Sequence, residues 1–246
     1  MLTAQEFFRG KTAVVFDFDG TLGETIGLWN QVDVELAARL GEPRSDAAAL
    51  HAFREDSLRR HALAENPYRS YCGDFGRRIG SKLTAEEIHA MRYQISRRML
   101  REDVRLRPGA ADLLKRLKAM GLRMAVATTT RKANMEIYCR TNEKIRSEIK
   151  LDEVFEGFVC AEDVDRIKPD GECYVKALAL LGVSAHRAFA VEDTLAGVQA
   201  ARAAGLDCIG FAEPHSAGDE QKIRSLTTLF FDTPADFVDW LDEGAL

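Results

Sequence analysis

The sequence predicts an α/β fold in which a mainly parallel sheet is interrupted by a helical insertion. Three observations lead to this prediction. An apolar strand lies within residues 11–22, whereas residues 24–104 show helical apolar spacing and no convincing strand. From Arg107 onward, short apolar runs alternate with helical segments, as expected of a parallel sheet. The insertion therefore separates the first strand of the α/β domain from its second.

The first strand is the apolar run Ala13-Val14-Val15-Phe16, which stops abruptly at Asp17. The insertion that follows should contain helices, because its apolar residues recur at helical spacing and Thr84 with Glu87 fits a capping box. The expected bounds of these helices are residues 29–40, 46 to about 61, and 84 to at least 99. Residues 67–80 show no clear pattern.

The second half is easier to divide, because glycines at 121, 182 and 205 end successive helical segments. Thr233 and Pro234 provide a cap and a first residue for a final helix. The expected helices cover residues 108–120, 132 to about 149, 169–181, 194–204 and the C-terminal segment. The expected strands cover residues 122–128, 158–161, 188–191, 208–211 and 229–231.

Composition limits the classes of function. The 246 residues are 46% hydrophobic, enough for a sizeable core in one domain, or one domain with a subdomain. The formal net charge is −5 without a basic run, which argues against nucleic acid or an anionic membrane as partner. The five cysteines form no C-x-x-C pair, and the opening segment is polar. We therefore expect a soluble, cytoplasmic protein with reduced thiols, present as a monomer or weak dimer.

Polar residues stand where predicted strands end. Asp17 and Asp19 project to the same side of the first strand, since strand residues alternate faces. The carboxyl ends of parallel strands form the ligand site of open α/β sheets. Three further groups occupy such positions, or precede a helix, later in the chain: Thr128, Lys168, and the pair Glu192 and Asp193.

These residue types suit phosphoryl chemistry. Clustered carboxylates are costly unless a cation uses them, and Mg²⁺ prefers oxygen ligands. A carboxylate can attack phosphorus and pass through an acyl phosphate, while a lysine and a hydroxyl offset the charge of the phosphoryl oxygens. A tight turn at Gly20 directs backbone N–H groups toward a phosphate. The sequence thus predicts a protein that binds Mg²⁺ and performs phosphoryl chemistry.

The four motifs, in this order, resemble those of the haloacid dehalogenase superfamily, in its phosphatase branch with a helical C1 cap. The run from Val126 to Thr130, with Asn134, resembles the β-phosphoglucomutase/CbbY-like members. The resemblance implies a Rossmann-like, doubly wound core at residues 1–22 and 105–246. It also implies a cap for substrate choice at residues 23–104, placed as a mobile lid over the site.

The resemblance also implies roles for individual residues. Asp17 would be the nucleophile, and Asp19 would protonate the leaving alcohol and then activate water. Thr128 and Lys168 would hold the transferring group. The implied substrate contacts are Gly20, Thr21, Thr129, Arg54 and Lys82. The implied Mg²⁺ site consists of Asp17, the Asp19 carbonyl, Asp193 and Glu192, the last as a ligand or a partner of one. For Arg54 and Lys82, a solvated charged helix face is the alternative.

Rival functions remain open at this point. Asp19 favours phosphate ester hydrolysis or a phosphomutase, because dehalogenases and phosphonate-cleaving members of this superfamily lack an aspartate there. Mutases of the β-phosphoglucomutase type carry a cap histidine where this chain has Trp29. A phospho-acceptor signalling domain also uses an aspartate, a threonine or serine and a lysine, but it lacks a large insertion. The expected substrate is a small phosphorylated metabolite such as a sugar phosphate or bisphosphate.

Overall fold

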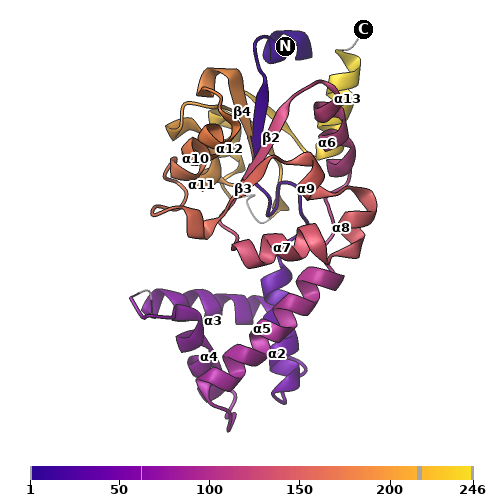
Figure 1. Cartoon of the computed structure of the whole chain (residues 1–246). Helices are drawn as coiled ribbons and strands as arrows, with labels where there is room; N and C mark the ends of the chain where they lie inside the picture. The colour runs from indigo at the N-terminus through magenta and orange to yellow at the C-terminus, as the bar shows by residue number, and fades with distance from the viewer. Residues whose placement is uncertain (1, 62, 215–217, 245–246) are drawn as a thin grey trace. The chain divides into compact units, whose positions relative to one another are not determined.

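A computed structural model describes residues 2–61, 63–214 and 218–244 (Figure 1). The chain forms two compact units. One unit consists of Met1–Thr25 and Val104–Leu246, and the other of Ile26–Asp103. Each unit has its own secondary structure.

The first unit is built on a six-stranded sheet with the order β3-β2-β1-β4-β5-β6. Every neighbouring pair is parallel. The predicted α/β fold with a parallel sheet is confirmed. The strands are β1 (Ala13–Phe16), β2 (Arg123–Ala127), β3 (Gly157–Val159), β4 (Ala188–Glu192), β5 (Asp207–Phe211) and β6 (Leu229–Phe231).

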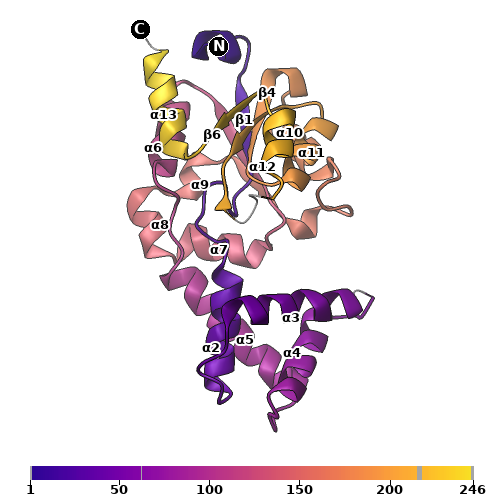
Figure 2. The same ribbon diagram turned by 180° about the vertical axis from the view of Figure 1, so that it is seen from behind.

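Helices cover both faces of this sheet (Figures 1 and 2). One face carries α10, α11 and α12, and the opposite side carries α6 and α13, which pack against each other. The helices of this unit are α1 (Ala4–Phe8), α6 (Ala110–Ala119), α7 (Lys132–Arg140), α8 (Glu143–Glu148), α9 (Leu151–Val154), α10 (Glu172–Leu181), α11 (Leu195–Ala203), α12 (Glu220–Leu226) and α13 (Pro234–Glu243). Short 3₁₀ turns occupy Ala161–Asp163 and Ala185–Arg187.

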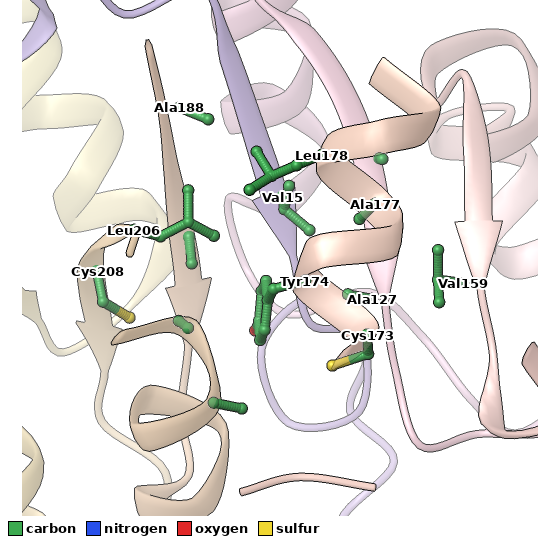
Figure 3. Close-up of a cluster of buried hydrophobic side chains, with 14 of the residues drawn as sticks. Val15, Ala127, Val159, Cys173, Tyr174, Ala177, Leu178, Ala188, Leu206 and Cys208 are labelled. Atoms are coloured by element: carbon green, nitrogen blue, oxygen red, sulfur yellow. The ribbon is translucent and has the colours of Figure 1, made fainter. Parts of the chain in front are cut away.

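The strand alternation decides which residues meet α10. Val15 and Ala127, from neighbouring strands, pack with Tyr174 and Ala177 of α10 in a fully buried cluster (Figure 3). Intervening residues such as Val14 and Phe16 are also fully buried, since the sheet is covered on both faces. This explains why the strands are continuous apolar runs.

The second unit is entirely helical in its described residues: α2 (Leu28–Arg39), α3 (Ala47–Arg60), α4 (Pro67–Arg78) and α5 (Ala85–Glu102). The capping box predicted at Thr84 is present, with reciprocal hydrogen bonds to Glu87. Helix α4 lies where the sequence pattern was unclear. It begins with an Asn66 cap and Pro67 at its first position, and it buries Tyr71 and Phe75.

The expected helix over residues 132–149 is in fact two helices. Asn142 interrupts it, because its Oδ1 accepts from the Ile145 N–H at 2.9 Å and its amide donates to the Val104 carbonyl at 3.0 Å. An asparagine side chain that binds backbone groups in this way favours a helix start over a helix interior. The short helices α1, α9 and α12 were not predicted. Helix α10 begins at Glu172, three residues later than expected.

Two general expectations can be compared with the structure. All five cysteines are buried and free of disulfides. Among the described residues, no helix combines the length and apolar character needed to cross a membrane.

Candidate active site

Neighbouring strands bring the predicted residues together at one edge of the sheet. Phe16 of β1 is in register with Val126 of β2 and Val191 of β4. The residues that follow these positions, Asp17, Thr128 and Asp193, therefore reach the same carboxyl edge. Lys168 reaches it from the segment that precedes α10, and its side chain contacts Asp17.

The centre of the site is an ion-pair cluster. The Lys168 Nζ lies 2.5 Å from Asp17 Oδ1 and 2.6 Å from Glu192 Oε1. All three side chains are at least nine-tenths buried. A buried ammonium with two carboxylates is stable only while both partners remain, because each charge has lost its water.

Three carboxylates in this cluster could hold a metal ion. One oxygen each of Asp17, Glu192 and Asp193 lie within 4.8 Å of one another. Thr21 donates a hydrogen bond to Asp193 Oδ1 at 2.6 Å, whereas Asp193 Oδ2 is buried without a hydrogen-bond partner in the described part of the chain. An unpartnered buried carboxylate oxygen beside two other carboxylates fits a hard divalent cation such as Mg²⁺.

Asp19 differs from the other three acids because it is partly exposed. Thr130, two residues beyond Thr128, donates its hydroxyl to Asp19 Oδ2. The Thr25 hydroxyl is also buried close by, and it lowers the pKa of Asp19. An accessible carboxyl group held by a hydroxyl suits proton transfer to and from a ligand.

Burial dominates the electrostatics. It raises the pKa of Asp17 well above its usual value, against the opposing effect of Lys168, and it raises the pKa of Asp193 to about 8. Burial also raises the pKa of Asp19, which the neighbouring threonine hydroxyls partly offset. Burial alone would lower the pKa of Lys168. The neighbouring carboxylates of Asp17 and Glu192 raise this pKa by more than burial lowers it, so the ammonium stays charged. The site needs more positive charge than one lysine provides.

This imbalance predicts a pH dependence of stability in metal-free protein. The folded chain keeps the Asp193 proton up to about pH 8, whereas the unfolded chain releases it near 3.8. The free energy of unfolding should therefore fall as pH rises from 5 to 8, by up to about 1.4 kcal/mol per unit for each such proton. Urea titrations at several pH values in chelator would measure this slope. Asp193→Asn should flatten it, and a slope unchanged in that variant would contradict the assignment.

Glu192 is held from several sides by residues that sequence patterns did not identify. The Tyr174 hydroxyl donates to Glu192 Oε1 at 2.7 Å (Figure 3 shows Tyr174 on α10). Gly197 on α11 leaves room for the carboxylate, since a Cβ there would lie 1.9 Å from Glu192 Oε1. Glu192 Oε2 also accepts from the Asp193 N–H at 3.2 Å. Glu192 therefore sits deep in the cluster and pairs with Lys168.

Arg107 is a second residue that patterns did not single out. Its guanidinium donates to the carbonyls of Gly20 at 2.6 Å, Ala212 at 2.8 Å and Asp232 at 3.2 Å. Ala212 follows β5 and Asp232 follows β6. One side chain thus ties the loop after Asp17 to the ends of two other strands. No local motif marks such a residue, because its partners are backbone carbonyls distant in sequence.

Two of the predicted phosphate contacts, Gly20 and Thr21, already have hydrogen-bond partners within the protein. The Gly20 N–H donates to the Gly23 carbonyl at 3.0 Å, with Gly20 at φ +89°. The Thr21 hydroxyl is used by Asp193, as described above. Thr129, at the end of β2, is exposed. Gly20 therefore shapes the turn, and its own N–H serves that turn.

The predicted contacts Arg54 and Lys82 belong to the helical unit. Arg54 is buried, and its Nη1 lies 2.5 Å from Asp33 Oδ2. Its Nη2 lies 3.0 Å from Asn30 Oδ1 and 2.8 Å from His51 Nδ1. Asp33 also pairs with Arg92 at 2.8 Å. Arg54 is thus not a solvated surface charge, whereas Lys82 is exposed before α5.

Comparison with known proteins identifies the family. The model of haloacid dehalogenase-like hydrolases matches residues 11–205. Protein CbbY of Cereibacter sphaeroides is 33% identical over 228 residues, which cover 88% of this chain and 93% of the relative. The phosphorylated carbohydrates phosphatase of Thermotoga maritima is 26% identical, over 94% of this chain and 98% of the relative.

A solved structure agrees with these matches. The crystal structure of a CbbY mutant from Rhodobacter sphaeroides in complex with xylulose 1,5-bisphosphate superposes with a TM-score of 0.66 at 30% identity. The match covers 92% of this chain and 96% of that one. The predicted resemblance is confirmed: the chain belongs to the haloacid dehalogenase-like hydrolases, an enzyme among relatives that are named phosphatases.

Proposed function

We propose that the protein is a Mg²⁺-dependent phosphatase that hydrolyses a small phosphorylated metabolite, a sugar phosphate or bisphosphate, through an aspartyl-phosphate intermediate. The observation that carries this proposal is the cluster of Asp17 and Lys168 with Glu192 and Asp193 at the end of β1. The relative named as a phosphorylated carbohydrates phosphatase and the solved CbbY complex with xylulose 1,5-bisphosphate support the substrate class.

The proposed reaction has two chemical steps. An Asp17 oxygen attacks phosphorus and the bond from phosphorus to the ester oxygen breaks, while Asp19 donates its proton to the leaving alcohol. Water then attacks the aspartyl phosphate, Asp19 takes a proton from it, and the Asp17 carboxylate is released with inorganic phosphate. Lys168 and Thr128 hold the phosphoryl oxygens. Mg²⁺, held by Asp17, Asp193, Glu192 and the Asp19 carbonyl, would neutralise the charge of the phosphoryl oxygens.

A phosphate-release screen over a panel of sugar phosphates and bisphosphates tests this function. Hydrolysis of at least one member, with stoichiometric free phosphate, is the expected result. Conversion of a hexose 1-phosphate into its 6-phosphate without phosphate release would identify a phosphomutase instead. Stable phosphorylation of Asp17 without turnover would indicate a phospho-acceptor domain.

Removal of divalent metal should stop the reaction. With a chelator in excess, we expect hydrolysis of a chromogenic phosphate ester to fall to background. Added Mg²⁺ should restore it better than Ca²⁺, since a few carboxylates with substrate suit octahedral coordination. The midpoint temperature of thermal unfolding should rise when Mg²⁺ is added. An ion that binds only the folded state increases the free energy of unfolding by about 2.7 kcal/mol at a concentration 100 times its Kd. Full activity in chelator would refute metal dependence.

In the helical unit, we propose that Arg54 and Lys82 contact the part of the substrate beyond the transferred phosphoryl group. Arg54 would exchange its Asp33 partner for a second anionic group. Arg54→Ala should raise KM for the best substrate of the panel about tenfold or more, and raise it less for p-nitrophenyl phosphate. Because Arg54 is also a structural ion pair, the thermal midpoint must be measured in parallel. Equal effects on both substrates would reject the contact.

The localisation, oligomeric state and partners that we propose are those expected from the sequence. We propose a cytoplasmic enzyme, monomeric or weakly dimeric, with no nucleic acid or membrane partner. The free, buried cysteines and the acidic net charge of −5 support this proposal.

A further inference from the structure

Thr130 holds the proposed acid and base, Asp19, by a direct side-chain contact. Its hydroxyl donates to Asp19 Oδ2 across 111 positions of sequence, and both residues are partly buried. Neither the sequence motifs nor the proposed roles of Thr128 and Thr129 require this contact. It brings the loop after β2 to the loop after β1, within the same unit.

The backbone around Thr130 limits where its hydroxyl can point. The Thr130 N–H donates to Thr128 Oγ1 at 3.1 Å, and the Thr130 carbonyl accepts from the Ala161 N–H at 3.0 Å. The Thr128 N–H in turn donates to the Val159 carbonyl of β3 at 2.9 Å. These bonds tie Thr128 to β3 and Thr130 to the 3₁₀ turn that follows β3, so the Thr130 hydroxyl is a preorganised partner for Asp19.

A hydroxyl is suited to a group that cycles between acid and base. The Thr130 hydroxyl can donate to Oδ2 both when Asp19 is a carboxylate and when its proton is on Oδ1, so the contact survives both protonation states. Because Thr130 engages Oδ2, the other carboxyl oxygen of Asp19, Oδ1, is the one that would carry the transferred proton. We propose that Thr130 is a positioning residue that orients Asp19 for proton donation to the leaving oxygen, an inference that rests on the proposed function.

The leaving group reports on this role. A nitrophenolate departs without protonation, whereas a phenolate, as a poorer leaving group, depends more on the acid. A series of aryl phosphates from p-nitrophenyl to p-methoxyphenyl phosphate varies how much the leaving group needs protonation, while the size and shape of the substrate stay similar. The value of kcat/KM depends only on the steps up to and including departure of the alcohol. It is therefore insensitive to the later hydrolysis of the aspartyl phosphate, in which Asp19 acts as a base.

The experiment compares wild type with Thr130→Val, Thr130→Ser and the control Thr12→Val. Thr12 precedes β1, at the opposite end of that strand. Thr130→Val should lower kcat/KM about tenfold or more for phenyl phosphate and less than about threefold for p-nitrophenyl phosphate. Thr130→Ser keeps the hydroxyl. This variant and Thr12→Val should show the same dependence of kcat/KM on the leaving group as wild type. An equal loss on every ester, or no loss, would overturn the proposal.

Asp19→Asn separates failure of this inference from failure of the proposed function. If Asp19 is the acid, kcat/KM of Asp19→Asn depends more steeply on the leaving group than that of wild type. The double variant with Thr130→Val should then show the same dependence as Asp19→Asn alone. If Asp19→Asn steepens the dependence and Thr130→Val does not, only the role of Thr130 is rejected. If Asp19→Asn itself leaves the dependence unchanged, the proposed proton transfer is wrong.

Discussion

Replacing Asp17 by asparagine is expected to abolish hydrolysis of every phosphate ester, with kcat reduced by about 10³-fold or more. The amide has the shape of the carboxylate but cannot attack phosphorus. The fold should survive, because Lys168 keeps Glu192 as a partner and the buried site loses one of several repelling carboxylates. Phosphate release and thermal unfolding of the same preparation measure both outcomes.

A matched variant separates this effect from a general loss of negative charge. Asp239, exposed on α13, can also be changed to asparagine. Asp239→Asn should leave both activity and unfolding close to wild type. Turnover by Asp17→Asn at the wild-type rate would remove Asp17 as nucleophile, and with it the proposed intermediate.

Lys168→Met should have the largest effect on stability. The substitution removes the one ammonium between Asp17 and Glu192, and those two carboxylates stay buried. Breaking a buried ion pair from one side costs about 3–5 kcal/mol. The loss should be greatest in chelator and smaller with Mg²⁺, because the ion supplies opposing charge. Activity should fall as well, since no other described ammonium pairs with Asp17.

Urea unfolding of Lys168→Met in chelator and in Mg²⁺ measures this effect. An exposed ion pair offers the control: Lys222 lies 3.1 Å from Asp219, with side chains 69% and 47% exposed. Lys222→Met should change the free energy of unfolding by less than about 1 kcal/mol. A Lys168→Met protein as stable as wild type in chelator would show that the buried carboxylates are protonated rather than paired.

The helices and strands were predictable from sequence where short-range patterns of residues determine them. The strands of the core are continuous apolar runs, and the capping box at Thr84 marks a helix start that the structure confirms. The candidate site could be assembled from sequence because its residues follow strands whose carboxyl ends meet. The roles of these residues remain predictions, although the structure brings Asp17, Lys168 and Glu192 into direct contact.

What sequence patterns did not reveal depends on partners distant in the chain. Arg107 binds carbonyls of Gly20 and Ala212, Tyr174 supports Glu192, and Thr130 binds Asp19. No periodicity encodes such pairs. The same reason explains Arg54, whose charge read equally well as a ligand contact or a solvated face until its partner Asp33 was visible.

The place of Arg107 in the chain matters for engineering chimaeras. This arginine comes just after the helical insertion, yet it binds the loop that follows the proposed nucleophile, Asp17. A graft that exchanges specificity with a relative should therefore be joined at Thr25 and Val104, so that the recipient keeps its own arginine. Splicing downstream of residue 107 would replace Arg107 by the donor's residue. Where that residue is not an arginine, the loop after Asp17 is expected to lose the hydrogen bonds through which Arg107 ties it to the ends of β5 and β6, even if the transplanted helices fold correctly.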